Sequence, residues 1–294
     1  MSLEDIRDLA RIASADVLAL NFIRSDAPYI FRAHFRSGLR SRIMEMITPA
    51  ALAREREGVM ADGLRLFPRA QPVKMLRIFR RRFSRLEEAL EETRRLKTLE
   101  AHLAPEFIAR SSEFYVDYHC GPRREILLCG IQEPVCGVPL DPWQADRPGY
   151  AEDLWRRLRA EASGTVDMSL AEFCRRLDDQ AARFIRQVRA MMDRDGLIPD
   201  LAGVRNLLVT HGPRVLLVDI NNIHPVVFDA QVPLDDKGYP VLDRSIDALE
   251  RLGRVFLGRS MLSSEADYRL FFSRERQRRV RELEARFTAM NASP

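Results

Sequence analysis

Strand-like apolar runs dominate the chain between residues 58 and 132. The segment PVKMLRIF, residues 72–79, has the β-branched and apolar content of a buried strand. Two further runs, EFYVDYHCG and REILLCGIQ, are joined by Gly121-Pro122, a dipeptide typical of turns. Asp62-Gly63 between GVM and LRLF is a hairpin signal. The pattern predicts a small region of strands that also contains one helix.

Other segments repeat apolar residues with helical spacing. Thr48 caps a short helix that ends at Gly58, and Ser169 caps a long helix that Gly196 ends. The segment YIFRAHF, residues 29–35, fits a strand or a helix equally well. The predicted helices cover residues 2–17, 48–57, 82–102, 169–195 and 262–290.

Glu92 falls inside the apolar stripe of the helix predicted over residues 82–102. A buried carboxylate without a partner loses several kcal/mol of hydration, so we expect a cation beside it. Lys74, on the preceding strand, is the candidate partner. The alternative is that Glu92 lies at the edge of the stripe and reaches solvent.

Three polar residues punctuate the stretch from Gly196 to Ile223. Asp200 follows the long helix, Asn206 precedes the apolar run LLV, and Asp219 follows the run VLLV. The two runs predict a hairpin with its turn near residue 211, which brings the three side chains to one edge. Carboxylate and amide oxygens are the hard ligands that Mg²⁺ prefers. The stretch therefore suggests a site for magnesium and phosphate.

Composition indicates a globular chain without a membrane span. The chain has 294 residues, of which 46% are hydrophobic and 31% charged, enough for one large or two moderate domains. No stretch approaches the ~20 uncharged apolar residues that a transmembrane helix needs. The acidic N-terminus is unlike a signal peptide, so we expect a cytoplasmic protein. The 4 cysteines form no C-x-x-C pair, so neither a zinc site nor a disulfide framework is indicated.

Arginine supplies most of the positive charge, and the formal net charge is +4. The arginines concentrate in three runs, RAHFRSGLRSR, RIFRRRFSR and RERQRRVRELEAR. Each run fits the solvated face of a helix or a strand end, an interpretation that we favour over a nucleic-acid footprint.

From about residue 58 to residue 256 the chain resembles the protein-kinase-like superfamily, which includes small-molecule phosphotransferases. Asp200, Asn206 and Asp219 match the catalytic aspartate, the metal-binding asparagine and the aspartate of the D-F-G motif. Lys74 stands where the family has its strand lysine, and Glu92 where the helix glutamate pairs with it.

The resemblance extends to the connector QEPVCGVPL, which is similar to the hinge between the two lobes and includes Glu133 and Val135. It implies an α+β, two-lobed fold with a small antiparallel sheet and one helix in the N-lobe and a mainly helical C-lobe. The implied organisation is a helical extension over 1–57, an N-lobe over 58–140, a C-lobe over 141–260 and a C-terminal helix over 261–294.

The activity that the resemblance implies is ATP- and Mg²⁺-dependent transfer of a phosphoryl group to the hydroxyl of an unidentified small-molecule or protein substrate. Asp200 would orient or deprotonate that hydroxyl, and Asn206 and Asp219 would bind Mg²⁺. Lys74, Glu92, Glu133 and Val135 would serve ATP binding.

The chain departs from the family pattern at two points. Asp200 and Asn206 enclose five residues where the family has four, and no G-x-G-x-x-G is present, with Gly58 and Gly63 as a loose substitute. Two alternatives therefore stay open. One is a catalytically degenerate scaffold that binds a nucleotide or a protein partner, and the other is a basic protein associated with nucleic acid.

Overall fold

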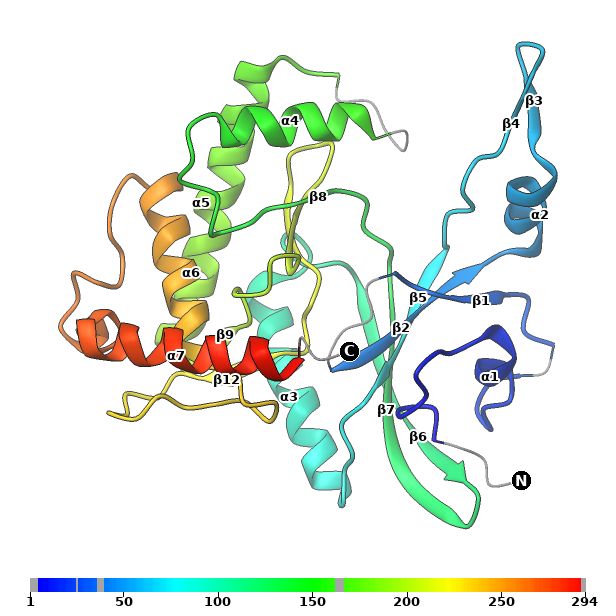
Figure 1. Cartoon of the computed structure of the whole chain (residues 1–294), viewed down its shortest axis with the longest axis horizontal. Helices are drawn as coiled ribbons and strands as arrows, with labels where there is room; N and C mark the ends of the chain where they lie inside the picture. The colour runs from blue at the N-terminus through cyan, green and yellow to red at the C-terminus, as the bar shows by residue number, and fades with distance from the viewer. Residues whose placement is uncertain (1–4, 25, 36–39, 162–166, 292–294) are drawn as a thin grey trace. The chain divides into compact units, whose positions relative to one another are not determined.

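The structure, a computed structural model, describes residues 5–24, 26–35, 40–161 and 167–291. The chain divides into two compact units of mixed α and β structure (Figure 1). Unit 1 comprises Met1–Thr93 and Arg110–Pro134, and unit 2 comprises Arg94–Ala109 and Val135–Pro294. The boundary between Pro134 and Val135 lies inside the connector that was expected to be a hinge.

Unit 1 is built on a five-stranded antiparallel sheet in the order β1-β2-β5-β7-β6 (Figure 1). Its strands are β1 (Ile30–Ala33), β2 (Ser41–Ile47), β5 (Lys74–Phe79), β6 (Ser111–Cys120) and β7 (Arg123–Gln132). The turn between β6 and β7 is at Gly121, in the left-handed conformation with φ 61°, as the turn dipeptide predicts. The strand predicted from PVKMLRIF is β5, although it begins only at Lys74.

Strands β1 and β2 lie in the segment that was predicted to be a helical extension. Ile30 pairs with Ile47 and Ala33 with Met44, so this segment belongs to the sheet. The ambiguous run YIFRAHF is therefore a strand over part of its length. Long-range pairing decided between two conformations that its local apolar pattern did not distinguish.

Different segments pack on the two faces of this sheet. On β5, Leu76 and Ile78 point to a face covered by the N-terminal segment, where they join a buried cluster with Ile6 and Val17. Phe79 points to the opposite face and packs with Ala89 of helix α3 (Leu86–Leu103). Helix α3 begins in unit 1 and ends in unit 2.

The N-terminal segment is mostly irregular, where a helix over 2–17 was predicted. Its one helix is α1 (Ser14–Leu18), and the predicted starting residue Ser2 lies outside the described residues. The segment is still integral to unit 1, because its apolar side chains complete the cluster on the sheet. Hydrogen bonds with the sheet fix it there, in place of helical packing: Ile6 N donates to Tyr118 Oη at 3.2 Å and Asn21 Nδ2 donates to the carbonyl of Asp117 at 2.7 Å.

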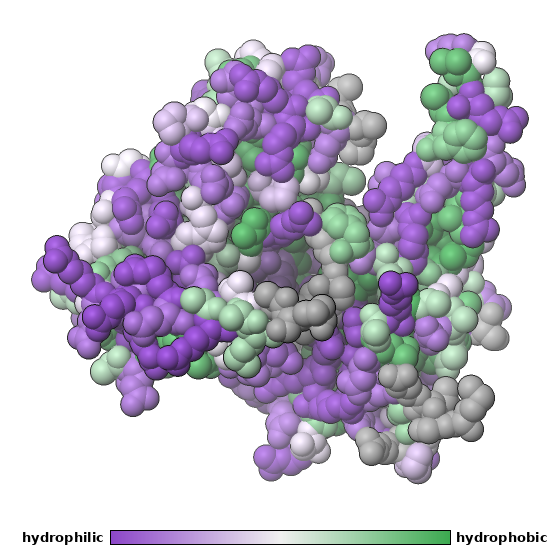
Figure 2. All heavy atoms as spheres, in the orientation of Figure 1, coloured by the Kyte–Doolittle hydropathy of each residue, from purple (hydrophilic) through white to green (hydrophobic). Residues whose placement is uncertain are grey.

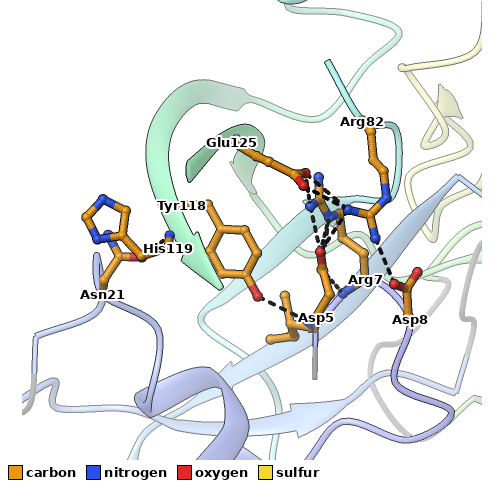
Figure 3. Close-up of polar contacts among 9 residues, drawn as sticks. Asp5, Arg7, Asp8, Asn21, Arg82, Tyr118, His119 and Glu125 are labelled. Atoms are coloured by element: carbon orange, nitrogen blue, oxygen red, sulfur yellow. Dashed lines mark hydrogen bonds and ion pairs between the residues drawn. The ribbon is translucent and has the colours of Figure 1, made fainter. Parts of the chain in front are cut away.

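A buried arginine anchors this segment to the sheet (Figure 3). Arg7 has 1% of its side chain exposed and lies between Asp5 and Glu125, as Figure 3 shows. Its Nη2 is 2.6 Å from Asp5 Oδ2 and also bonds Glu125, while Arg82 lies 3.0 Å from Asp5. Burial raises the pKa of Asp5, but the hydrogen bonds and charge of Arg7 outweigh it, so the net pKa is lowered.

The segment between β2 and β5 holds helix α2 (Pro49–Glu57) and the hairpin of β3 (Val59–Ala61) and β4 (Leu64–Leu66). Both agree with the sequence: Thr48 caps α2, and Asp62 and Gly63 form the turn with positive φ. Among the described strands, β3 and β4 pair only with each other. Met60 and Leu64 on the hairpin and Phe67 directly after it are each more than 60% exposed, and Figure 2 shows apolar surface on this hairpin.

Unit 2 is mainly helical around three short strand pairings. Its helices are α4 (Tyr150–Ala160), α5 (Leu170–Asp195), α6 (Val241–Phe256), the 3₁₀ helix η1 (Asp267–Phe272) and α7 (Arg274–Asn291). Its strands are β8 (Val138–Pro139), β9 (Leu197–Pro199), β10 (Leu207–Val209), β11 (Val215–Leu217) and β12 (Ile223–Pro225). They form two small sheets, β11-β10-β8 and β12-β9.

Helix α5 is the centre of the unit 2 core, and its ends agree with the sequence. Ser169 Oγ accepts a hydrogen bond from Glu172 N, and Gly196 is left-handed at φ 62°. Phe173, Leu177 and Phe184 are completely or almost completely buried in one cluster with α6. Of the helices described, none is long and apolar enough to cross a membrane.

Much of the arginine is used inside the fold. In the second run, Arg77 is buried, Arg81 pairs with Glu92 at 2.7 Å, and Arg82 pairs with Asp8 at 2.7 Å. In the third run, Arg276 is buried against Asp243 of α6 at 2.5 Å. These arginines have structural partners, so their presence in the sequence is no argument for nucleic-acid binding.

Candidate functional site

The strand pairings of unit 2 bring the predicted polar residues together. Asp200 directly follows β9 and Asn222 directly precedes β12; these strands pair with Ile223 opposite Pro199. Asn206 directly precedes β10 and Asp219 follows β11; these strands pair with Leu207 opposite Leu217. Each antiparallel pair therefore delivers two polar side chains to one of its ends.

Asp200 is held by hydrogen bonds to both of its carboxylate oxygens. Oδ1 accepts from Ala202 N at 2.8 Å, and Oδ2 accepts from Asn222 Nδ2 at 2.8 Å. The backbone of Asp200 donates to the carbonyl of Asn222 at 2.7 Å. Asp200 is 9% exposed and Asn222 6% exposed, so the carboxylate has one defined orientation in a poorly solvated setting.

Burial raises the pKa of Asp200 to about 6, and the charge of Asp219 adds to the rise. The bonds from Ala202 and Asn222 act in the opposite direction, because they favour the charged carboxylate. Asn206 links the two segments through the backbone: its Nδ2 donates to the Asp200 carbonyl, and its own carbonyl accepts from Val218 N, next to Asp219. Asp219 itself is half-buried.

The loop between Asp200 and Asn206 fixes the asparagine amide. Asn206 Nδ2 donates to the carbonyl of Asp200 at 3.0 Å, and Asn206 N donates to the carbonyl of Gly203 at 2.9 Å. A Cβ on Gly203 would lie 2.6 Å from the Asn206 side chain, so only glycine leaves room for it. Because Nδ2 faces the backbone, Oδ1 is the atom of Asn206 that remains for a ligand.

The donor set fits a magnesium ion that keeps most of its water. Within the described ranges no three His, Cys, Asp or Glu side chains converge as a metal site. The predicted pair of Asn206 and Asp219 offers one amide and one carboxylate oxygen. Mg²⁺ in phosphate-binding sites commonly uses only one or two protein ligands, so the number and the type of oxygen ligands in this pair match what Mg²⁺ requires.

The loop between Asp200 and Asn206 is held by residues that sequence reasoning missed. Trp143 Nε1 donates to the carbonyl of Ala202 at 3.2 Å, and Leu201 N donates to Ser245 Oγ of α6 at 3.1 Å. Arg244 stacks on Trp143, with its guanidinium carbon 3.7 Å from the ring centroid. These contacts come from segments about 40 to 60 residues away in sequence, so no local motif marked them.

The predicted pairing of Lys74 with Glu92 is wrong. Lys74 Nζ lies 3.5 Å from Glu133 Oε1, and Glu92 pairs with Arg81 at 2.7 Å. Glu92 does have a cation beside it, as its position in the stripe required, but the cation comes from the end of β5. Side chains alternate along a strand, so Lys74 shares a face with Leu76 and lies opposite the face that α3 covers.

Arg77 is the cation that the α3 face of the sheet carries. It is 2% exposed and shares that face with Phe79. It lies opposite Gly130 of β7, which in turn lies opposite Glu113 of β6. Lys74 and Arg77 are three positions apart, and residues an odd number of positions apart on a strand point to opposite faces, so this signal was present in the sequence.

The other two predicted nucleotide-binding residues lie on the connector. Glu133 is exposed at the end of unit 1, and Val135 is half-buried at the start of unit 2. Glu133 N donates to the carbonyl of Arg110 at 2.9 Å, and Gly137 approaches the carbonyl of Val209 so closely that a Cβ would lie 2.4 Å from it. The connector is thus held at both ends by backbone contacts.

Comparison with known proteins gives no family for this chain. No family model and no curated protein matches it. Among solved structures, the chain matches "ROP18 kinase domain in complex with AMP-PNP and sucrose" at 12% identity, covering 90% of this chain and 80% of that chain. The TM-score is 0.36, and a likeness at this level supports no argument about function.

Proposed function

We propose that this protein is a Mg²⁺- and ATP-dependent phosphotransferase that acts on a hydroxyl group. The observation that carries the proposal is the position of Asp200, Asn206 and Asp219 at the ends of two strand pairs in unit 2, with Asn206 Nδ2 bonded to the Asp200 carbonyl and the Asn206 carbonyl bonded to Val218 N. The sequence resemblance to the protein-kinase-like superfamily supports the same assignment. Phosphoryl transfer needs little more from a protein than positioned charges and an acceptor for one proton, and this constellation supplies both.

Asn206 Oδ1 and Asp219 would hold the metal ion, which supplies positive charge to neutralise phosphate oxygens when bound. The fixed amide of Asn206 makes its oxygen available without rearrangement. Asp219 carries the negative charge that a cation requires.

Asp200 would orient the acceptor hydroxyl and accept its proton. As the hydroxyl oxygen bonds to phosphorus and ADP leaves, the proton passes to the Asp200 carboxylate. A pKa of about 6 leaves this carboxylate mostly ionised at pH 7 while it remains a stronger base than an ordinary aspartate. The bonds from Ala202 and Asn222 keep it in position before the substrate arrives.

Nucleotide binding by unit 1 remains part of the proposal, with Lys74 as the candidate cation for phosphate. Its side chain is 42% exposed and shares a surface ion pair with Glu133, so a phosphate can reach it. Arg77 is 2% exposed on the face of the sheet that α3 covers, so it is a structural cation.

A thermal-shift titration with ATP tests the proposal. We expect MgATP to stabilise the native protein and ATP with EDTA to do so much less, because ligand binding raises stability by mass action. Asp219→Asn should remove the Mg²⁺-dependent part, whereas Asp179→Asn should not, because Asp179 is 68% exposed on α5. No stabilisation at millimolar MgATP, or an equal shift in Asp219→Asn, would refute the proposal.

A second candidate function is a scaffold that binds nucleotide or a protein partner without turnover. The observation that favours it is the state of Asp200, which is 9% exposed and already accepts hydrogen bonds at both oxygens. The two functions separate in one assay: a scaffold shows the MgATP shift but no ADP release above that of Asp200→Asn.

A further inference from the structure

Three side chains form a hydrogen-bonded chain that ends at Asp200. His224 Nε2 lies 2.5 Å from Asn222 Oδ1, and Asn222 Nδ2 lies 2.8 Å from Asp200 Oδ2. His224 is on β12, opposite Ile198 of β9, and Asp200 follows the end of β9. These hydrogen bonds therefore connect His224, across the small β9-β12 sheet, to Asp200, the candidate base.

The hydrogen bonds among His224, Asn222 and Asp200 are consistent with only one arrangement of protons on these three side chains. An ionised Asp200 oxygen accepts, so Asn222 must present its Nδ2 to it and its Oδ1 to His224. Oδ1 only accepts, so His224 must carry hydrogen on Nε2. A histidine with hydrogen on Nδ1 alone would place two acceptors 2.5 Å apart.

Burial makes the orientation of Asn222 consequential. Asn222 is 6% exposed, so water does not readily replace a lost partner. Without a donor at Oδ1, the contact with Asp200 alone holds the amide, and a buried acceptor is left unpaired. An amide that turns to find another donor for Oδ1 withdraws Nδ2 from the carboxylate of Asp200.

We propose that His224 is a positioning residue for Asp200 and acts through Asn222. Its Nε2–H holds the Asn222 amide so that Nδ2 donates to Asp200 Oδ2, which keeps the carboxylate in the orientation that Ala202 N also fixes. The catalytic consequence rests on the proposed function, in which Asp200 receives the proton of the acceptor. The hydrogen-bonded chain itself does not rest on it.

Histidine NMR tests the chain independently of activity. The 294-residue chain contains 5 histidines, so long-range ¹H–¹⁵N spectra of ¹⁵N-histidine-labelled protein are tractable, and His224→Gln assigns the resonance by its loss. We expect Nε2 of His224 to carry hydrogen, and Asn222→Leu to shift its resonance. An unprotonated Nε2 in the native protein would overturn the inference, whatever the protein catalyses.

Kinetics test the positioning role. His224→Leu should lower kcat by about tenfold, near the upper end of what one neutral hydrogen bond contributes, with KM for ATP little changed. His224→Gln should recover most of kcat, because its amide nitrogen can donate in place of Nε2. His211→Leu, in the turn of the β10–β11 hairpin, is the matched control and should leave kcat unchanged.

A double-mutant cycle decides whether His224 acts through Asn222. In an Asn222→Leu background, His224→Leu should have no further effect on kcat. Additive effects, or equal losses in His224→Leu and His224→Gln, would refute the positioning role. If the native protein turns over no ATP, the proposed function fails, and the NMR result alone then decides whether the hydrogen-bonded chain exists.

Discussion

Replacement of Arg7 by methionine should release the N-terminal segment from the sheet of unit 1. Arg7 is 1% exposed and joins Asp5, which is 10% exposed, to Glu125, which is 24% exposed. Removal of one partner from a buried ion pair costs about 3–5 kcal/mol, because the remaining charge loses hydration without compensation. Arg82 remains 3.0 Å from Asp5 and 3.1 Å from Glu125, so we expect the low end, about 3 kcal/mol.

Hydrogen exchange of the segment that covers residues 5–23 measures this effect directly. A cost of about 3 kcal/mol raises the opening constant of the segment by roughly 100-fold, since each 1.4 kcal/mol is a factor of ten. Arg85→Met is the matched control: Arg85 is 76% exposed, its partner Glu88 lies 3.7 Å away, and such a surface pair contributes about 0–1 kcal/mol. Replacement of Arg7, Asp5 and Glu125 together by Met, Asn and Gln should restore most of the protection, because no buried charge is then unpaired.

The pH dependence of the same exchange gives a second measurement. The net pKa values of Asp5 and Glu125 are lowered from 3.8 and 4.5, with burial opposing and the Arg7 contacts dominating. A lowered folded pKa means that the stabilisation is complete above the unfolded values and disappears as pH falls through the folded ones. Native protection should therefore decrease below about pH 4 and the triple variant should lack that decrease. A loss of less than about 1 kcal/mol in Arg7→Met at pH 7 would refute this account of the segment.

Four further substitutions test other parts of the structure. Gly203→Ala should cost about 1–3 kcal/mol and weaken the MgATP shift, because its Cβ would lie 2.6 Å from the Asn206 side chain; urea denaturation and thermal shift measure the two effects. Lys74→Met should cost less than about 1 kcal/mol in urea denaturation and should weaken the ATP shift, whereas Arg77→Met, at a side chain that is 2% exposed, should cost several times more stability. Arg276→Met should cost about 3 kcal/mol or more and increase proteolysis of α7, because its carboxylate partner on α6 is 0% exposed; unchanged proteolysis would contradict this.

Features with local signals were predictable from the sequence. The capped helix α5, the turn at Gly121 and the hairpin at Asp62 each depend on residues within a few positions of the feature itself. The strands around Asn206 and Asp219 were predictable for the same reason, since a tight hairpin joins them. The site residues at strand ends could therefore be named before their contacts were known.

Features that depend on distant segments were not predictable in the same way. The N-terminal segment has an amphipathic pattern, but packing against the sheet and the Arg7 ion pairs determine its conformation, and only five residues are helical. The partner of Glu92 was chosen by sequence order, whereas the alternation of side chains on β5 excludes Lys74 from that face. The β9-β12 pairing brings Asn222 and His224 next to Asp200, and no local sequence pattern specifies that pairing.

The extra residue between Asp200 and Asn206 is no reason to expect an inactive protein. The loop ends are fixed independently of its length: Asn206 Nδ2 bonds the Asp200 carbonyl at 3.0 Å, and Val218 N bonds the Asn206 carbonyl at 2.8 Å. The turn from Gly203 to Asn206 takes up the added length, and Val204 there is 52% exposed, so the chain bulges toward solvent. Deletion of Val204 disrupts the Gly203–Asn206 turn but leaves the residues of both loop-end contacts in place, so the Mg²⁺-dependent ATP shift should stay within about threefold in affinity. Loss of the shift would show that the loop length itself positions the metal ligands.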